Sequence, residues 1–130
     1  MKKLFYLTLI IFSVFSSCND DESENKSPII GNWKLSQGKI YVTSQTGEIT
    51  LKTVNYDQQN IVYNFKSDNT LVISGANSET LGYNNGDYKF NYNSDNIEID
   101  NLKWMSTYSK STLILDQSYV DGSQLILTRN

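Results

Sequence analysis

The feature that most constrains the fold is an alternation of apolar and polar residues that recurs from Ile29 to the end of the chain. The clearest case lies around Phe90, where Tyr88, Phe90 and Tyr92 share one face and polar residues occupy the other. No window in this region has apolar residues at the spacing of an amphipathic helix. A chain of 130 residues with this pattern predicts one all-β domain.

The alternating segments are short and are separated by clusters of Asn, Asp, Ser and Gly, which favour turns. In the first segment the apolar parity shifts between Leu35 and Ile40, and Gly38 at the shift predicts a bulge. We expect about eight or nine strands, over residues 33–42, 48–56, 61–65, 70–74, 87–92, 97–100, 102–108, 112–116 and 124–129. Strands joined by short turns pair with their sequence neighbours, and about eight of them can close on themselves without open edges. The predicted fold is a small antiparallel up-and-down β-barrel.

The composition excludes several kinds of chemistry. The sequence contains no His and a single Cys, which rules out a disulfide framework, a Cys/His zinc site and any imidazole base or thiolate nucleophile in the folded domain. The net charge is −3, whereas a nucleic-acid-binding surface is positive. We therefore expect no metal, no cofactor, no nucleic-acid partner and no enzymatic activity.

Carboxylates are the acid and base groups that remain. Glu98 and Asp100 share one strand face, opposite Ile97 and Ile99, so a glycosidase-like pair would face water rather than a cleft. The acidic and amide residues near Asp95 lack the spacing of a calcium loop and are better explained by turn chemistry.

The first 17 residues have the layout of a secretion signal. Two lysines follow Met1, an apolar run of about twelve residues extends from Leu4 to Phe15, and two small residues precede a Cys. The run is too short to cross a bilayer permanently, which takes about twenty residues. We expect residues 1–17 to be removed.

The small residues directly before Cys18 resemble the bacterial lipobox, in which the Cys becomes the first mature residue and is acylated. The resemblance implies lipidation of Cys18 and a lipid anchor in the outer membrane. Several acyl chains make such attachment effectively permanent. An ordinary secretory signal with an incidental Cys is the alternative.

Residues 18–28 form an acidic segment without apolar side chains, which cannot fold on its own. We interpret it as a tether that reaches about 35 Å when fully extended. An acidic cluster after the lipidated Cys is similar to the surface-export signal of Bacteroidetes lipoproteins, which implies location at the cell surface. A plain solvated linker, with the protein on the periplasmic face, is the alternative.

Two motifs frame the remaining domain, residues 29–130. Gly31 and Trp33 form a Gly-x-Trp near its start, and Arg129 ends an alternating run that includes Leu125 and Leu127. Together they resemble the lipocalin (calycin) family, and residues 65–71 and 111–115 look like the small lipocalin-like lipoproteins of the Bacteroidetes. The resemblance implies that Arg129 packs over the Trp33 indole at the closed end of the barrel. The parity of Arg129 agrees, and such stacking is worth about 0.5–2 kcal/mol.

Two sets of residues are candidates for binding. Tyr88, Phe90 and Tyr92 either line a ligand cavity or fill the barrel, since an eight-stranded barrel has room for side chains or for one small ligand. Leu81 and Tyr83 lie in the longest connection, residues 75–86, where we expect a mouth or a partner-binding surface.

The lipocalin-like resemblance favours a lipid-anchored binding module that holds a small apolar molecule or a glycan. The alternative is a structural or inhibitory surface lipoprotein with a solid barrel that binds another protein through its loops. An internal void of about 300 Å³ or more would favour the first, and a packed interior would favour the second.

Overall fold

The computed structural model describes residues 27–118 and 122–129. The predicted signal, the lipidation site Cys18 and most of the predicted tether lie outside these residues. The regular structure of the described part consists of nine strands: β1 (Gly31–Thr43), β2 (Ile49–Asn55), β3 (Val62–Phe65), β4 (Thr70–Ser74), β5 (Gly86–Asn93), β6 (Asn96–Ile99), β7 (Leu102–Tyr108), β8 (Thr112–Asp116) and β9 (Gln124–Arg129).

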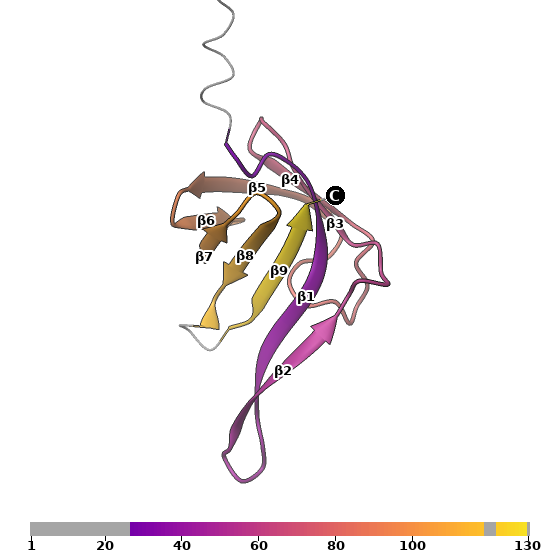
Figure 1. Cartoon of the computed structure of the whole chain (residues 1–130), viewed down its shortest axis with the longest axis vertical. Coiled ribbons are helices and arrows are strands. Elements are labelled where there is room, and N and C mark those ends of the chain that lie inside the picture. The colour runs from indigo at the N-terminus through magenta and orange to yellow at the C-terminus, as the bar shows by residue number, and fades with distance from the viewer. Residues whose placement is uncertain (1–26, 119–121, 130) are drawn as a thin grey trace, which may run out of the picture.

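The strands form one sheet that closes on itself. Its order is β2-β1-β3-β4-β5-β6-β7-β8-β9, and a further pairing of β1 with β9 completes the closure (Figure 1). Every pairing is antiparallel. The barrel wall therefore has eight strands, with β2 as an addition, and the predicted all-β antiparallel barrel is confirmed.

Strands β2 and β3 lie end to end along the same edge of β1. Strand β3 pairs with the first residues of β1, and β2 pairs with β1 from Gln37 onward. The chain loops out between them at residues 57–60, flanked by hydrogen bonds from the Tyr56 amide to the Ser36 carbonyl (2.8 Å) and from the Leu35 amide to the Ile61 carbonyl (2.9 Å). The strand expected at residues 48–56 is thus present, but it extends the β3 edge instead of forming a further wall strand.

The hairpin of β1 and β2 projects beyond the barrel. On the other edge of β1, strand β9 reaches only to Lys39, so the residues that follow have no barrel strand beside them. Figure 1 shows this hairpin extending away from the C-terminal end of the barrel. We call residues 40–52 the distal hairpin.

The bulge in β1 differs slightly from the prediction. The register of β1 against β9 shifts between Leu35 and Gln37, at Ser36 instead of Gly38. The extra residue turns Gly38 toward the interior, where a side chain would collide with Leu81. Gly38 is thus required by close packing after the bulge, and it does not form the bulge.

The inward-facing residues of the eight wall strands form one core together with Ile29, Tyr56 and Ile61 beside them. Phe65 and Phe90 meet edge to face, with ring centroids 5.1 Å apart, a favourable aromatic geometry. The buried apolar residues are Ile29, Trp33, Leu35, Tyr56, Ile61, Tyr63, Phe65, Leu71, Ile73, Phe90, Ile97, Ile99, Trp104, Leu113, Leu115, Leu125 and Leu127.

Candidate functional site

One end of the barrel is closed by Trp33 and Arg129. The Arg129 Cζ atom lies 4.2 Å from the centre of the Trp33 ring. The Arg129 guanidinium donates to the carbonyls of Ile30 (3.1 Å) and Pro28 (2.6 Å), and the Trp33 indole N–H donates to the carbonyl of Ile29 (2.7 Å). The polar groups of both side chains are therefore used in contacts within the domain. We call this closed end of the barrel the floor.

The opposite end is covered by the connection between β4 and β5, residues 75–85. Its Leu81 amide donates to the Tyr56 hydroxyl (2.9 Å), and the Leu81 side chain lies so close to Gly38 that a Cβ there would be 2.8 Å from it. Leu81 was expected at a mouth or partner surface. The structure places it at this end of the barrel, partly buried against the core.

Tyr83, in the same connection, also turns inward. The Trp104 indole N–H donates to the Tyr83 hydroxyl (2.7 Å), which lies 3.4 Å from the Ile99 carbonyl. Burial raises the pKa of Tyr83 to about 12. The connection therefore acts as a plug, because its two large apolar side chains fill this end of the barrel.

The three candidate cavity residues of β5 have different surroundings. Phe90 is buried against Phe65, whereas Tyr88 and Tyr92 are partly buried at the edge of the core. The Tyr88 ring packs on Tyr83, and its hydroxyl donates to the Asn84 carbonyl (2.7 Å). In these positions the three side chains pack against the core or its edge.

Tight packing also surrounds Gly82 in the plug. A Cβ there would lie 2.8 Å from both a Leu125 methyl and the Tyr63 hydroxyl. Burial raises the pKa of Tyr63 far above its ordinary value. Gly82 itself is exposed, and a side chain there would press on Leu125 and Tyr63 beneath it.

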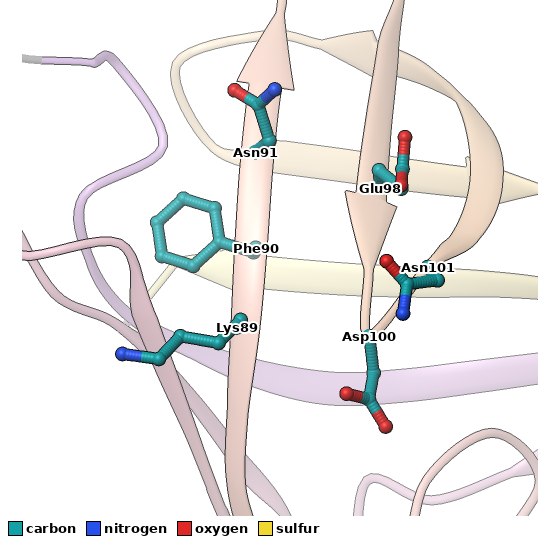
Figure 2. A pocket seen from close by; sticks show the side chains of 6 residues that line it. All are labelled: Lys89, Phe90, Asn91, Glu98, Asp100 and Asn101. Atoms are coloured by element: carbon teal, nitrogen blue, oxygen red, sulfur yellow. The ribbon is translucent and has the colours of Figure 1, made fainter.

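A polar hollow lies on the outer side of β5 and β6. Figure 2 shows residues of β5 on one strand, Glu98 on its neighbour, and Asp100 and Asn101 in the turn that follows. Both turn residues have positive φ, 51° and 69°, a conformation that Asp and Asn tolerate. The hollow measures about 260 Å³ and is lined by Lys89, Phe90, Asn91, Glu98, Asp100 and Asn101. Its donors and acceptors are suited to a hydroxyl-rich molecule.

The distal hairpin carries most of the exposed apolar surface. Of the seven large apolar side chains that are well exposed among residues 27–118 and 122–129, four belong to it. Ile49 is 65% exposed and Leu51 50%, and the other two are Tyr41 and Val42. Leu51 is directly opposite Tyr41, and Ile49 is opposite Thr43, so Tyr41, Ile49 and Leu51 share one face of the hairpin.

Among residues 27–118 and 122–129, no strand pairs with the outer edge of β2. The Ser44 amide donates to the Glu48 carbonyl (2.8 Å), and residues 44 and 48 are therefore a hydrogen-bonded pair. Since such pairs alternate along an antiparallel ladder, Thr50 and Lys52 direct their backbone groups toward β1. The N–H and C=O groups of Ile49, Leu51 and Thr53 point to the open edge.

The sequence analysis did not identify this surface. Ile49 and Leu51 alternate with polar residues in the strand expected at 48–56, as residues of a core face do. A signal was nevertheless present, because the expected strands at residues 33–42 and 48–56 are consecutive and longer than those that follow. A long hairpin next to short strands must project beyond them.

In residues 27–118 and 122–129, His, Cys, Asp and Glu side chains form no group of three that could hold a metal ion. The same residues include no helix that is long and apolar enough to span a membrane.

The chain matches no protein-family model, no curated protein and no solved structure. Its function is therefore argued from its own residues and geometry.

Proposed function

We propose that this chain is a lipid-anchored protein of the bacterial outer membrane that binds another protein through its distal hairpin. The observation that carries the proposal is the combination of an exposed apolar face with an unpaired strand edge on the same hairpin. Exposed apolar patches mark interaction sites, and an open edge can accept a further strand through main-chain hydrogen bonds.

The place of the hairpin relative to the anchor is compatible with this role. The tether joins the barrel at its floor, where Arg129 contacts Pro28. The distal hairpin lies at the other end of β1, a strand of 13 residues that spans about 40 Å. Attachment through Cys18 therefore leaves the hairpin accessible.

The packed interior supports a solid barrel over a ligand-filled one. Leu81 and Tyr83 cover the end at which a small apolar molecule would enter, and Phe90 packs on Phe65. A cavity ligand is usually held in about 300–1,000 Å³ of space. At the buried Gly38, an added Cβ would lie 2.8 Å from Leu81, so the core beneath the connection is closely packed at this point.

The anchor is tested by Cys18→Ala in the full chain, expressed in a bacterium that processes lipoproteins. We expect loss of labelling by a fatty-acid analogue and release of the protein from the membrane fraction. Ser17→Ala is the control, since it keeps a small residue before the Cys. Unchanged labelling and membrane retention of the Cys18→Ala chain would overturn the lipid anchor.

Binding by the hairpin is tested with a photo-crosslinking amino acid at position 49 of the full chain in intact cells. We expect a protein adduct from this position, and the same amino acid at Asn91, on the outer barrel wall, serves as control. If position 49 gives no more adduct than position 91, the hairpin is not a protein-binding surface.

A glycan ligand is a second candidate, and the polar hollow of β5 and β6 favours it. Carboxylate, amide and ammonium groups surround about 260 Å³ and could hydrogen-bond sugar hydroxyls. NMR titration of the protein with glycans from its host envelope would shift the resonances of Asn91 and Asn101. Glu98→Gln should weaken these shifts, Glu79→Gln should not, and titration without any shift would exclude the candidate.

A further inference from the structure

We infer that the partner of the distal hairpin is a second copy of this chain, with two β2 strands paired antiparallel about a two-fold axis at Thr50. This inference rests on the proposed function of the hairpin and names its partner. Its basis is the sequence of β2 and the direction of its backbone groups.

The backbone permits such pairing. The groups of Ile49, Leu51 and Thr53 that face the open edge are those that an additional antiparallel strand needs. In a two-fold symmetric contact the same patch is used by both copies. Residues directly opposite each other must both direct their backbone groups to the shared edge or both away from it. The two-fold axis therefore passes between two copies of one residue, on which the register is centred. With Thr50 at the centre, Ile49 and Leu51 of each copy exchange main-chain hydrogen bonds with the partner's Leu51 and the partner's Ile49.

The charges of Glu48, just before β2, and Lys52, within it, select this register among its neighbours. Centring on Thr50 places Glu48 opposite the partner's Lys52, and symmetry repeats the pair. Centring on Leu51 would place Lys52 opposite a Thr, and centring on Lys52 would place two lysines opposite each other. Opposite charges across a strand pair stabilise it, and like charges destabilise it. The Thr50 register alone satisfies both charged residues of this segment.

The same register brings the exposed apolar side chains together. Tyr41 and Leu51 are opposite each other in the hairpin, and the partner's Ile49 would continue this row across the interface. The two-fold axis repeats the row, which creates an apolar strip across a four-stranded sheet. Contacts between cross-strand neighbours would thus replace part of the exposure of Ile49 and Leu51.

The pairing is compatible with anchoring of both copies. The two floors would lie at opposite ends of an elongated dimer, because the β2 strands run in opposite directions. Each tether reaches about 35 Å when extended, which lets the pair lie along one membrane.

The register is tested by disulfide formation in the full chain. Thr50 of the two copies would form a non-hydrogen-bonded pair with Cα atoms about 4.5 Å apart, within the range of a disulfide. We expect Thr50→Cys to give a dimer of the chain on a non-reducing gel after oxidation. The unmodified chain controls for Cys18, and Thr53→Cys controls for position, since its two copies would be about 20 Å apart. A dimer from Thr53→Cys equal to that from Thr50→Cys would overturn the register.

Charge reversal provides a second test in the Thr50→Cys background. Lys52→Glu would place carboxylates opposite each other twice, and we expect about a tenfold lower cross-linking rate. Adding Glu48→Lys to this variant restores the opposite charges and should restore the rate. If the double reversal cross-links as slowly as the single one, complementary pairing is wrong.

Failure of this inference can be distinguished from failure of the proposed function. Adducts at position 49 that contain only other proteins, together with no dimer from Thr50→Cys, would overturn self-pairing and leave protein binding intact. No adduct at position 49 and no dimer would overturn both.

Discussion

The guanidinium of Arg129 stacks on the indole of Trp33, with its Cζ atom 4.2 Å from the ring centre, and the two residues are paired across β1 and β9. These are the first and last strands of the sheet in the chain, and their pairing closes the barrel. The stacked pair therefore joins the ends of the domain at the point where the tether begins.

Replacement of Arg129 by Lys should destabilise the barrel while it keeps the charge. The contact of the guanidinium with the Trp33 ring is lost, and a single ammonium is less suited to reach the carbonyls of both Ile30 and Pro28. We expect the free energy of unfolding to fall by about 1–3 kcal/mol, measured by denaturant titration. Lys110→Arg, at an exposed position, is the control, and equal midpoints for both variants would contradict the role of the pair.

Replacement of Gly82 by Ala tests the packing of the plug. Gly82 has a φ of +96°, and a Cβ would lie 2.8 Å from Leu125 and Tyr63. Backbone strain and the collision should together lower the free energy of unfolding by about 2–4 kcal/mol. Gly47→Ala shares the positive φ, +83°, but meets nothing within 4 Å, so it should show only the strain of about 1 kcal/mol. Thermal unfolding of the two variants separates these effects, and equal losses would show that the plug is loosely packed.

Local patterning predicted the barrel because each wall strand keeps one face toward the core. Period-two alternation places Arg129 on the same face as Leu127, and closure of the sheet then brings it to Trp33. Neither step requires long-range information beyond the number of strands. The same reasoning could not decide between a cavity and a filled barrel, because side-chain parity is identical in both.

The features that the sequence alone could not place depend on where elements lie relative to one another. Leu81 and Tyr83 lie in an irregular connection, and only its path over the barrel end shows that they cover the core. Ile49 and Leu51 alternate as core residues do, but β3 takes the place beside the start of β1 and leaves β2 outside the wall. An alternating pattern fixes the face of a residue, whereas its burial depends on what covers that face.

Alkaline pH should destabilise the protein through its buried tyrosines. Burial raises the pKa of Tyr83 to about 12 and that of Tyr63 further, whereas tyrosines of the unfolded chain titrate near 10. Above about pH 10 the unfolded chain loses protons that the folded chain keeps, so the free energy of unfolding falls as the pH rises. Denaturant titrations between about pH 8 and 11.5 measure this slope. Tyr63→Phe should flatten it, and a slope equal to that of the unmodified protein would argue against the buried hydroxyl.

The exposure of the distal hairpin predicts that its apolar side chains contribute little to folding. Ile49 is 65% exposed, whereas Ile99 is fully buried in the barrel wall. Replacement by Thr keeps the β-branch, so the two substitutions differ mainly in the burial that they remove. Ile99→Thr should lower the free energy of unfolding by about 2–4 kcal/mol, and Ile49→Thr by no more than about 0.5 kcal/mol. Denaturant titration at a concentration where light scattering shows a monomer makes the comparison independent of association. A loss above 1 kcal/mol for Ile49→Thr under these conditions would mean that Ile49 is retained for folding, and its exposed face would no longer be evidence for a binding surface.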